Sequence, residues 1–184
     1  YSYLSNTNRL NSQLFYDQQE LKQRKFWNYN FDGLLLSEII DNGSSPDPHD
    51  FTGVSLRLIK EMTLNLEGPY FGMPRIIEEK FWTPEGVRLL RKAILTYTTG
   101  GRIAQRDCYD ADGVFRYRLS YQYDSQGRLI EETDPIGRIQ RFSYDVCGNK
   151  ISHQHYSGRV QANFTFDYAN RLTAACQTGD DGIE

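Results

Sequence analysis

The sequence predicts an all-β fold, made of consecutive antiparallel β-hairpin repeats that form a curved sheet or a strip of a β-shell. Three observations support this prediction. Aromatic residues are abundant, with 13 Tyr, 10 Phe and 2 Trp, and they fit the half-buried surface of a sheet. The 15 glycines supply the positive φ angles of tight turns. Turn signals recur about every 10 to 11 residues in the second half of the chain.

Composition limits the classes of function. With 184 residues, of which 39% are hydrophobic and 24% charged, the chain can bury a core. A net charge of -3 favours neither nucleic acid nor an anionic membrane as a partner. No apolar run approaches the roughly 20 residues that cross a bilayer, so no membrane span is predicted. The sequence begins at Tyr1 without a Met, and we expect it to be a fragment of a longer protein.

An internal repeat is clearest between Tyr121 and Leu172. The segments YDSQGRL, YDVCGNK and FDYANRL each place an aromatic residue before Asp, with Gly or Asn three residues after the Asp. Tyr123 and Tyr144 are 21 residues apart, and Tyr144 and Phe166 are 22 apart. A period of this kind indicates a repeat architecture.

Intermediate turns divide each period into two strands. DPIGRI occupies Asp134–Ile139, and YSGRV occupies Tyr156–Val160. Because two turns fall in each period, one period corresponds to one hairpin.

The repeat continues upstream in a degenerate form. The step of four from an aromatic residue to a glycine recurs at Trp82–Gly86, Tyr97–Gly101 and Tyr109–Gly113, and less clearly at Tyr29–Gly33. The segment YDQQELK, which starts at Tyr16, keeps the Tyr-Asp pair but lacks the glycine. Leu56–Glu67 alternates as a strand and is preferred to a helix. We therefore expect a single domain over 1–184, with degenerate hairpins at 1–66 around a loop at 41–53, a transitional hairpin at 67–96, clear repeats at 97–177 and a tail at 178–184.

The turn residues have a structural explanation. Asp accepts hydrogen bonds from backbone N–H groups two or three residues later, and Gly takes the left-handed position. Tyr packs along the sheet, and the Arg after Gly lies on a ring or pairs with the Asp. The positions to which we assign this structural role are Tyr97, Gly101, Tyr109, Asp110, Gly113, Tyr123, Asp124, Gly127, Arg128, Asp134, Gly137, Arg138, Tyr144, Asp145, Gly148, Phe166, Asp167, Asn170 and Arg171.

Catalytic and metal-binding motifs are weak by comparison. His153 and His155 would share one face of a strand, which makes them the best metal candidates, but no Cys, Asp or Glu lies nearby in sequence to complete a ligand set. The adjacent pair Glu131 and Glu132 points to opposite faces and cannot form an acid–base dyad. We predict neither an enzyme nor a cofactor.

The segments YDADG, YQYDSQGRLIEETDPIGRIQRFSYDVCGNK and FDYANRL resemble the tyrosine-aspartate (YD) repeats of Rhs proteins, Tc-toxin C components and teneurins. The resemblance implies a non-catalytic wall segment of a hollow β-shell that encapsulates or presents a toxin or effector domain. It also implies a secreted or cell-surface location, with the rest of the same polypeptide and the enclosed domain as partners. The self-cleavage signature of Rhs shells does not occur among these residues, so DPIGRI is interpreted as an ordinary turn.

Two further expectations remain open at the sequence level. A binding module could hold carbohydrate or a cell-surface protein on exposed aromatic rows, and burial of Tyr109, Tyr123 and Tyr144 would weaken that alternative. Unpaired edge strands would also promote self-association, unless the segments near Tyr1 and Thr178 cover them.

Overall fold

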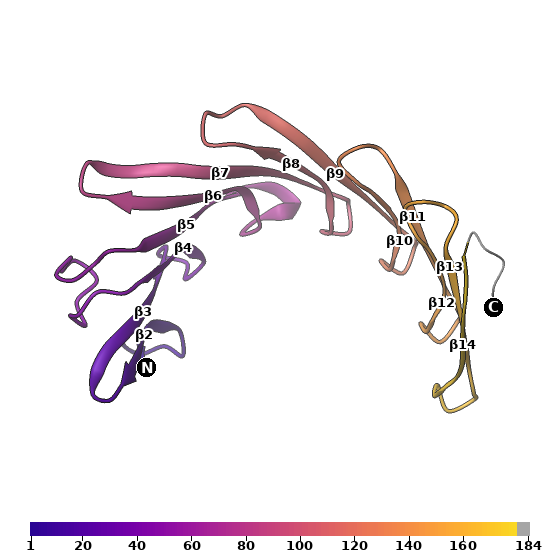
Figure 1. Cartoon of the computed structure of the whole chain (residues 1–184), viewed down its shortest axis with the longest axis horizontal. Coiled ribbons are helices and arrows are strands. Elements are labelled where there is room, and N and C mark those ends of the chain that lie inside the picture. The colour runs from indigo at the N-terminus through magenta and orange to yellow at the C-terminus, as the bar shows by residue number, and fades with distance from the viewer. Residues whose placement is uncertain (180–184) are drawn as a thin grey trace. The chain divides into compact units, whose positions relative to one another are not determined.

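A computed structural model describes residues 1–179, and these residues form 14 antiparallel strands in one open sheet. The order of strands in the sheet is their order in the chain, so every neighbouring pair is a hairpin (β2 to β14 are labelled in Figure 1). This confirms the predicted all-β fold of consecutive hairpins. The strands are β1 (Ser2–Tyr3), β2 (Leu10–Asp17), β3 (Glu20–Tyr29), β4 (Leu35–Asp41), β5 (Arg57–Leu64), β6 (Pro74–Thr83), β7 (Gly86–Tyr97), β8 (Ile103–Tyr109), β9 (Phe115–Tyr123), β10 (Leu129–Thr133), β11 (Ile139–Tyr144), β12 (Lys150–Gln154), β13 (Gln161–Phe166) and β14 (Leu172–Thr178).

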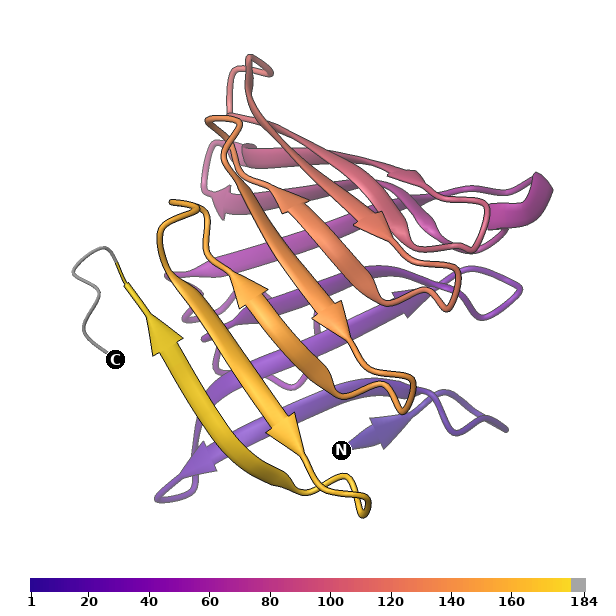
Figure 2. The ribbon, with the colours of Figure 1, turned by 90° about the vertical axis from the view of Figure 1, so that its right-hand side faces the viewer.

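The chain divides into two compact units. One contains Tyr1–Leu95 and Cys108–Arg116, and the other contains Thr96–Asp107 and the residues from Tyr117 onward. In the second unit, the strands from β10 to β14 follow one another in a single layer (orange to yellow in Figure 2). The alternation that predicts strands is visible in β13, whose residues alternate between exposed and half-buried.

The hydrophobic core is thin. Among the described residues, the buried apolar side chains are Phe26, Leu64, Ala93, Leu95 and Cys108. A sheet with so little buried apolar surface depends more on cross-strand pairs and on its turns than a two-layered domain does.

Consecutive strands alternate in direction, so the turns of the second unit lie at two opposite rims of the sheet. The first rim consists of the turns at 98–102, 124–128, 145–149 and 167–171, and the second rim consists of those at 134–138 and 155–160. Aromatic residues that end a strand pair with the residue that begins the next one, as Tyr123 does with Leu129, Tyr144 with Lys150 and Phe166 with Leu172. A bulge follows each pair, and the register is therefore repeated from hairpin to hairpin.

The predicted loop at 41–53 lies between β4 and β5, although Asp41 itself ends β4 and is buried. Leu56–Glu67, which the alternation assigns to a strand, contains β5. The predicted transitional hairpin at 67–96 contains one 3₁₀ turn, at Gly68–Tyr70, ahead of β6 and β7. Part of the predicted tail, residues 180–184, lies outside the described residues.

Candidate functional site

The repeated turn is the most regular chemical feature of the chain. In the turn at 124–128, the Asp124 carboxylate accepts hydrogen bonds from the backbone N–H groups of Gln126 and Arg128, both at 2.9 Å. Its second oxygen pairs with Nε of Arg128 at 2.6 Å. Gly127 lies at a φ of 76°, a left-handed value that costs glycine little. The hydrogen bond from the residue two positions ahead is as the sequence predicts. The other comes from four positions ahead, one residue farther than predicted, because the turn contains five residues.

The same geometry recurs at the other predicted turns. Asp134 and Asp167 make the same pair of backbone contacts and the same ion pair, with Arg138 and Arg171 respectively. Asp145 bonds to Asn149, which replaces the arginine. The left-handed position is occupied by Gly101, Gly113, Gly137, Gly148 and Asn170.

Degenerate turns replace Asp by residues with equivalent acceptors. Asn30, after Tyr29, accepts from the N–H of Leu34 at 2.8 Å. Thr98, after Tyr97, accepts from the N–H of Arg102 through its hydroxyl at 3.3 Å. The turn after Asp17 differs, because Gln18 and Gln19 both have positive φ and form a two-residue hairpin loop.

The turn contacts favour the ionised aspartates. The backbone N–H of Arg128 is the largest cause of the lowered pKa of Asp124, and that of Arg171 acts in the same way on Asp167. For Asp145 the largest cause of the lowered pKa is the side-chain hydrogen bond from Asn149. These carboxylates are therefore structural acceptors and are poorly suited to proton transfer near neutral pH.

Tyrosines at the first rim join neighbouring strands. The hydroxyl of Tyr144 donates to the carbonyl of Leu129 at 2.9 Å, and the hydroxyl of Tyr123 donates to the carbonyl of Ile103 at 3.0 Å. In the other unit, Tyr29 donates in the same way to Leu10, also at 3.0 Å. Each acceptor is the first residue of its strand.

Arginines of one turn cover the tyrosine of the next. The Arg128 guanidinium lies 4.9 Å from the ring centre of Tyr144 and donates to the carbonyl of Asp145 at 2.8 Å. Arg102 lies 5.7 Å from the ring centre of Tyr123. Successive turns of this rim are therefore linked by aromatic, ionic and backbone contacts.

A polar cluster occupies the second rim. Arg138 lies 5.7 Å from the ring centre of Tyr156, and the Gln140 amide donates to Glu132 at 2.7 Å and to the Tyr156 hydroxyl at 3.1 Å. Burial, followed by a hydrogen bond with Glu132, raises the pKa of Tyr156 to about 12. The cluster joins three strand ends through side chains that turn spacing does not single out.

The two candidate metal ligands lie near this cluster. His153 stacks on Phe142 at 4.8 Å, and its Nε2 lies 3.0 Å from the Gln140 amide oxygen. The rings of His153 and His155 are 6.3 Å apart. Over residues 1–179, no group of three His, Cys, Asp or Glu side chains is arranged to hold a metal ion. In the same part of the chain, no helix is both long and apolar enough to cross a bilayer.

Sequence reasoning missed a buried ionic cluster in the first unit. Arg24 is fully buried, and its Nε and Nη2 contact the two carboxylate oxygens of Asp41 at 2.5 and 3.0 Å. Arg57 also donates to Asp41, at 2.9 Å. The remaining donors of Arg24 contact the carbonyls of Ser45, Asp47 and Asp50, so Arg24 anchors the long loop. No motif marks Arg24, since it occupies an ordinary position in β3.

Comparisons with known proteins found several similar solved structures. Among solved structures, the chain is similar to TcdB2-TccC3-Cdc42 (10% identity, TM-score 0.46, covering 98% of this chain and 13% of that one). It is also similar to TcdB2-TccC3 without its hypervariable C-terminal region (14% identity, TM-score 0.47, covering 90% of this chain and 10% of that one). A third similar structure is the Photorhabdus luminescens Tc holotoxin pore with a substituted TccC3 (14% identity, TM-score 0.30, covering 93% of this chain and 12% of that one). The chain thus spans about an eighth or less of the length of these structures, and no curated protein matches it.

The family model described as RHS Repeat matches residues 123–160. This stretch contains the turns after Tyr123 and Tyr144 and the intermediate turn at Asp134, whose contacts are given above. Residues 123–160 therefore match an Rhs repeat, and over this stretch the match confirms the resemblance of the sequence to YD/Rhs repeats.

Proposed function

We propose that the chain is a non-catalytic wall segment of an Rhs/YD shell that encapsulates or presents a toxin or effector domain, in a secreted or cell-surface protein. One observation carries the proposal: the Asp, Arg, Tyr and Gly positions of the repeat are used to hold one turn and to join it to the next. Arg128 illustrates this, since it contacts Asp124, Tyr144 and the carbonyl of Asp145. Side chains engaged in this way serve continuity of the sheet, as in other repeat proteins.

A binding module on aromatic rows receives less support from this geometry. Tyr109, Tyr123 and Tyr144 are half-buried, and Tyr123 and Tyr144 use their hydroxyls on backbone carbonyls. The rings of Tyr123 and Tyr144 lie beneath guanidinium groups, which occupy the face that a sugar would need. A glycan array probed with the chain would restore this alternative if it gave specific binding.

Limited proteolysis of the natural polypeptide that carries these residues tests the wall proposal. We expect a domain joined to this segment to resist protease in the native protein. We expect it to become sensitive when the double substitution Asp124→Ala and Asp145→Ala loosens the first rim. An exposed-residue variant, Val146→Ala, serves as the control. Enclosure would be contradicted if the joined domain were equally sensitive to protease in the native protein, the double variant and the Val146→Ala control.

A further inference from the structure

We infer that the turn at 98–102 is a binding site for an oxyanion, a carboxylate or phosphate group, held by the guanidinium of Arg102 and the backbone N–H of Gly100. This turn of the first rim joins β7 to β8. It has the donors that hold an aspartate in other turns of the rim, but Thr98 stands in the place of that aspartate. The inference goes beyond the wall role, because it concerns one turn and not the continuity of the sheet.

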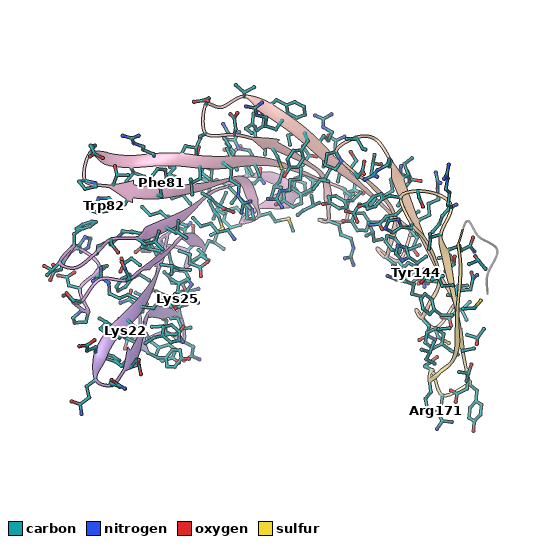
Figure 3. The ribbon with its side chains drawn as sticks, in the orientation of Figure 1. Lys22, Lys25, Phe81, Trp82, Tyr144 and Arg171 are labelled. Carbon is teal, nitrogen blue, oxygen red and sulfur yellow. The ribbon has the colours of Figure 1, made fainter. Side chains whose placement is uncertain are left out.

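The aspartate turns show which donors hold a carboxylate. In the turn at 124–128, the Asp124 carboxylate accepts hydrogen bonds from the backbone N–H groups of Gln126 and Arg128 and from Nε of Arg128. The turn that ends at Arg171, which Figure 3 labels at the end of the β13–β14 connection, repeats these three contacts on its own aspartate. A turn of this form therefore surrounds one carboxylate with two backbone donors and a guanidinium.

Two of these donors lack an acceptor in the turn at 98–102. The Thr98 hydroxyl accepts from the backbone N–H of Arg102 at 3.3 Å, and so replaces one oxygen of the aspartate. Within residues 1–179, neither the N–H of Gly100 nor the Arg102 guanidinium makes a hydrogen bond or an ion pair. Both residues are exposed, so these donors are accessible to a ligand.

The Arg102 guanidinium is held in place without being neutralised. It lies 5.7 Å from the ring centre of Tyr123, and a Cβ at Gly127 would be only 2.5 Å from its Nε, so it rests on the ring and on the next turn. Asp124, the nearby carboxylate, is already paired with Arg128. The charge of Arg102 therefore has no carboxylate partner in the part of the chain that the structure describes.

A polar groove gives the ligand room. It has a volume of about 440 Å³ and lies between the turns at 98–102 and 124–128. Beside Arg102, it is lined by the side chains of Thr99, Ser125 and Gln126, which carry further hydrogen-bond donors. Pockets for small molecules have volumes of about 300 to 1,000 Å³, so a small acidic molecule fits here as well as a bare ion.

An NMR titration tests the site. Sodium phosphate and, separately, sodium acetate are added to the 184-residue chain at constant ionic strength. We expect saturable shifts of the Arg102 Nε–H and Gly100 N–H signals, and the anion that saturates at the lower concentration identifies the preferred group. Arg128 and Arg138 are internal controls, because their Nε groups already donate to aspartates and should not shift.

Substitution of Thr98 provides the specificity test. Thr98→Asp supplies a carboxylate within the chain, so it should weaken anion binding by about tenfold or more, the range of a hydrogen bond to a charged group. Thermal denaturation should show this variant to be at least as stable as the parent chain, since it gains the ion pair of the other turns. Thr98→Asn is the matched control: it adds a neutral acceptor, as Asn30 does in its turn, and should leave binding within about threefold.

Several results would overturn the inference. They are the absence of a saturable shift at Arg102, equal shifts at Arg102, Arg128 and Arg138, which would indicate screening by salt alone, and unchanged binding in Thr98→Asp. Arg102→Ala gives the same test if Thr98→Asp fails to fold, and binding as tight as in the parent chain would contradict the site. None of these results bears on the protease protection of a joined domain, so the wall proposal is tested separately.

Discussion

At the scale of single residues, Arg24 shows how the first unit holds its long loop. The guanidinium and the Asp41 carboxylate have no exposed side-chain surface, and the remaining Arg24 donors are used by loop carbonyls. A buried charge of this kind is tolerated because its donors are satisfied, and removal of one partner leaves the other without compensation.

Substitution of Arg24 tests this account. Arg24→Met should lower the free energy of unfolding by about 3 to 5 kcal/mol, because Asp41 then remains buried with only Arg57 as a cationic partner. Lys22→Met is the control, since both side chains of its ion pair with Glu20 are exposed and such pairs contribute about 0 to 1 kcal/mol. Urea denaturation measures both, and a loss for Arg24→Met no larger than the control would refute the assignment.

Tyr156 offers a spectroscopic test of the second rim. Its pKa is raised to about 12 by burial and then by the hydrogen bond with Glu132. A folded-state pKa above the unfolded value of about 10 contributes stability below pH 10, and this stability is lost as pH rises toward 12. NMR titration of the phenol carbon should show Glu132→Gln bringing the pKa closer to 10. An unchanged pKa in Glu132→Gln would exclude the hydrogen bond as a cause.

At the scale of the hairpin, a comparison of Gly127 with Gly113 distinguishes the effect of a left-handed backbone from the effect of crowding by a neighbouring side chain. Both have a φ of 76°. A Cβ at Gly127 would lie 2.5 Å from Nε of Arg102, whereas a Cβ at Gly113 would meet nothing within 4 Å. The two glycines thus share a conformation but differ in their surroundings.

Alanine substitution should resolve these two effects. Gly113→Ala should lower the free energy of unfolding by about 1 to 2 kcal/mol, because alanine is strained in the left-handed conformation. Gly127→Ala should cost more, because Arg102 must leave its place over Tyr123. In a chain that also carries Arg102→Ala, the two glycine substitutions should lower the free energy of unfolding by equal amounts, as measured by thermal denaturation. A difference that persists in that background would show that Arg102 is not its source.

The turn aspartates predict a dependence of stability on pH. Because hydrogen bonds lower the pKa of Asp124, Asp145 and Asp167 in the folded chain, their contribution is present above the unfolded pKa of about 3.9 and is lost as pH falls through the lower folded values. The triple variant with Asn at these positions should show a smaller loss of stability between pH 5 and pH 3. Asn30 occupies the same position in a natural turn, so the fold should be retained. A loss as steep as that of the unsubstituted chain would show that other groups govern acid unfolding.

At the scale of the whole molecule, each strand that the structure describes pairs only with its neighbours in the chain. Contacts of this kind make stability approximately a sum over hairpins, with coupling between adjacent ones. The molecule should therefore open locally, hairpin by hairpin, before it unfolds globally.

Hydrogen exchange can detect this behaviour. Asp167→Ala removes the acceptor of the turn between β13 and β14, so amides of those strands should exchange faster. Amides of β2 to β5 should keep their rates, because no strand pairing connects them directly to that turn. A uniform increase in exchange over all strands would indicate a single cooperative unit.

The sequence by itself determined the all-β class and the places of the turns from Tyr97 onward, because Asp, Gly and the preceding aromatic act within five residues of one another. Local chemistry of this kind is readable from spacing. Only the tertiary structure decided which groups meet between strands: that Arg128 covers Tyr144, that the Tyr144 hydroxyl reaches Leu129, and that Arg24 is buried against Asp41. These contacts depend on strand register and on burial, which join residues far apart in the chain and leave no fixed spacing in it.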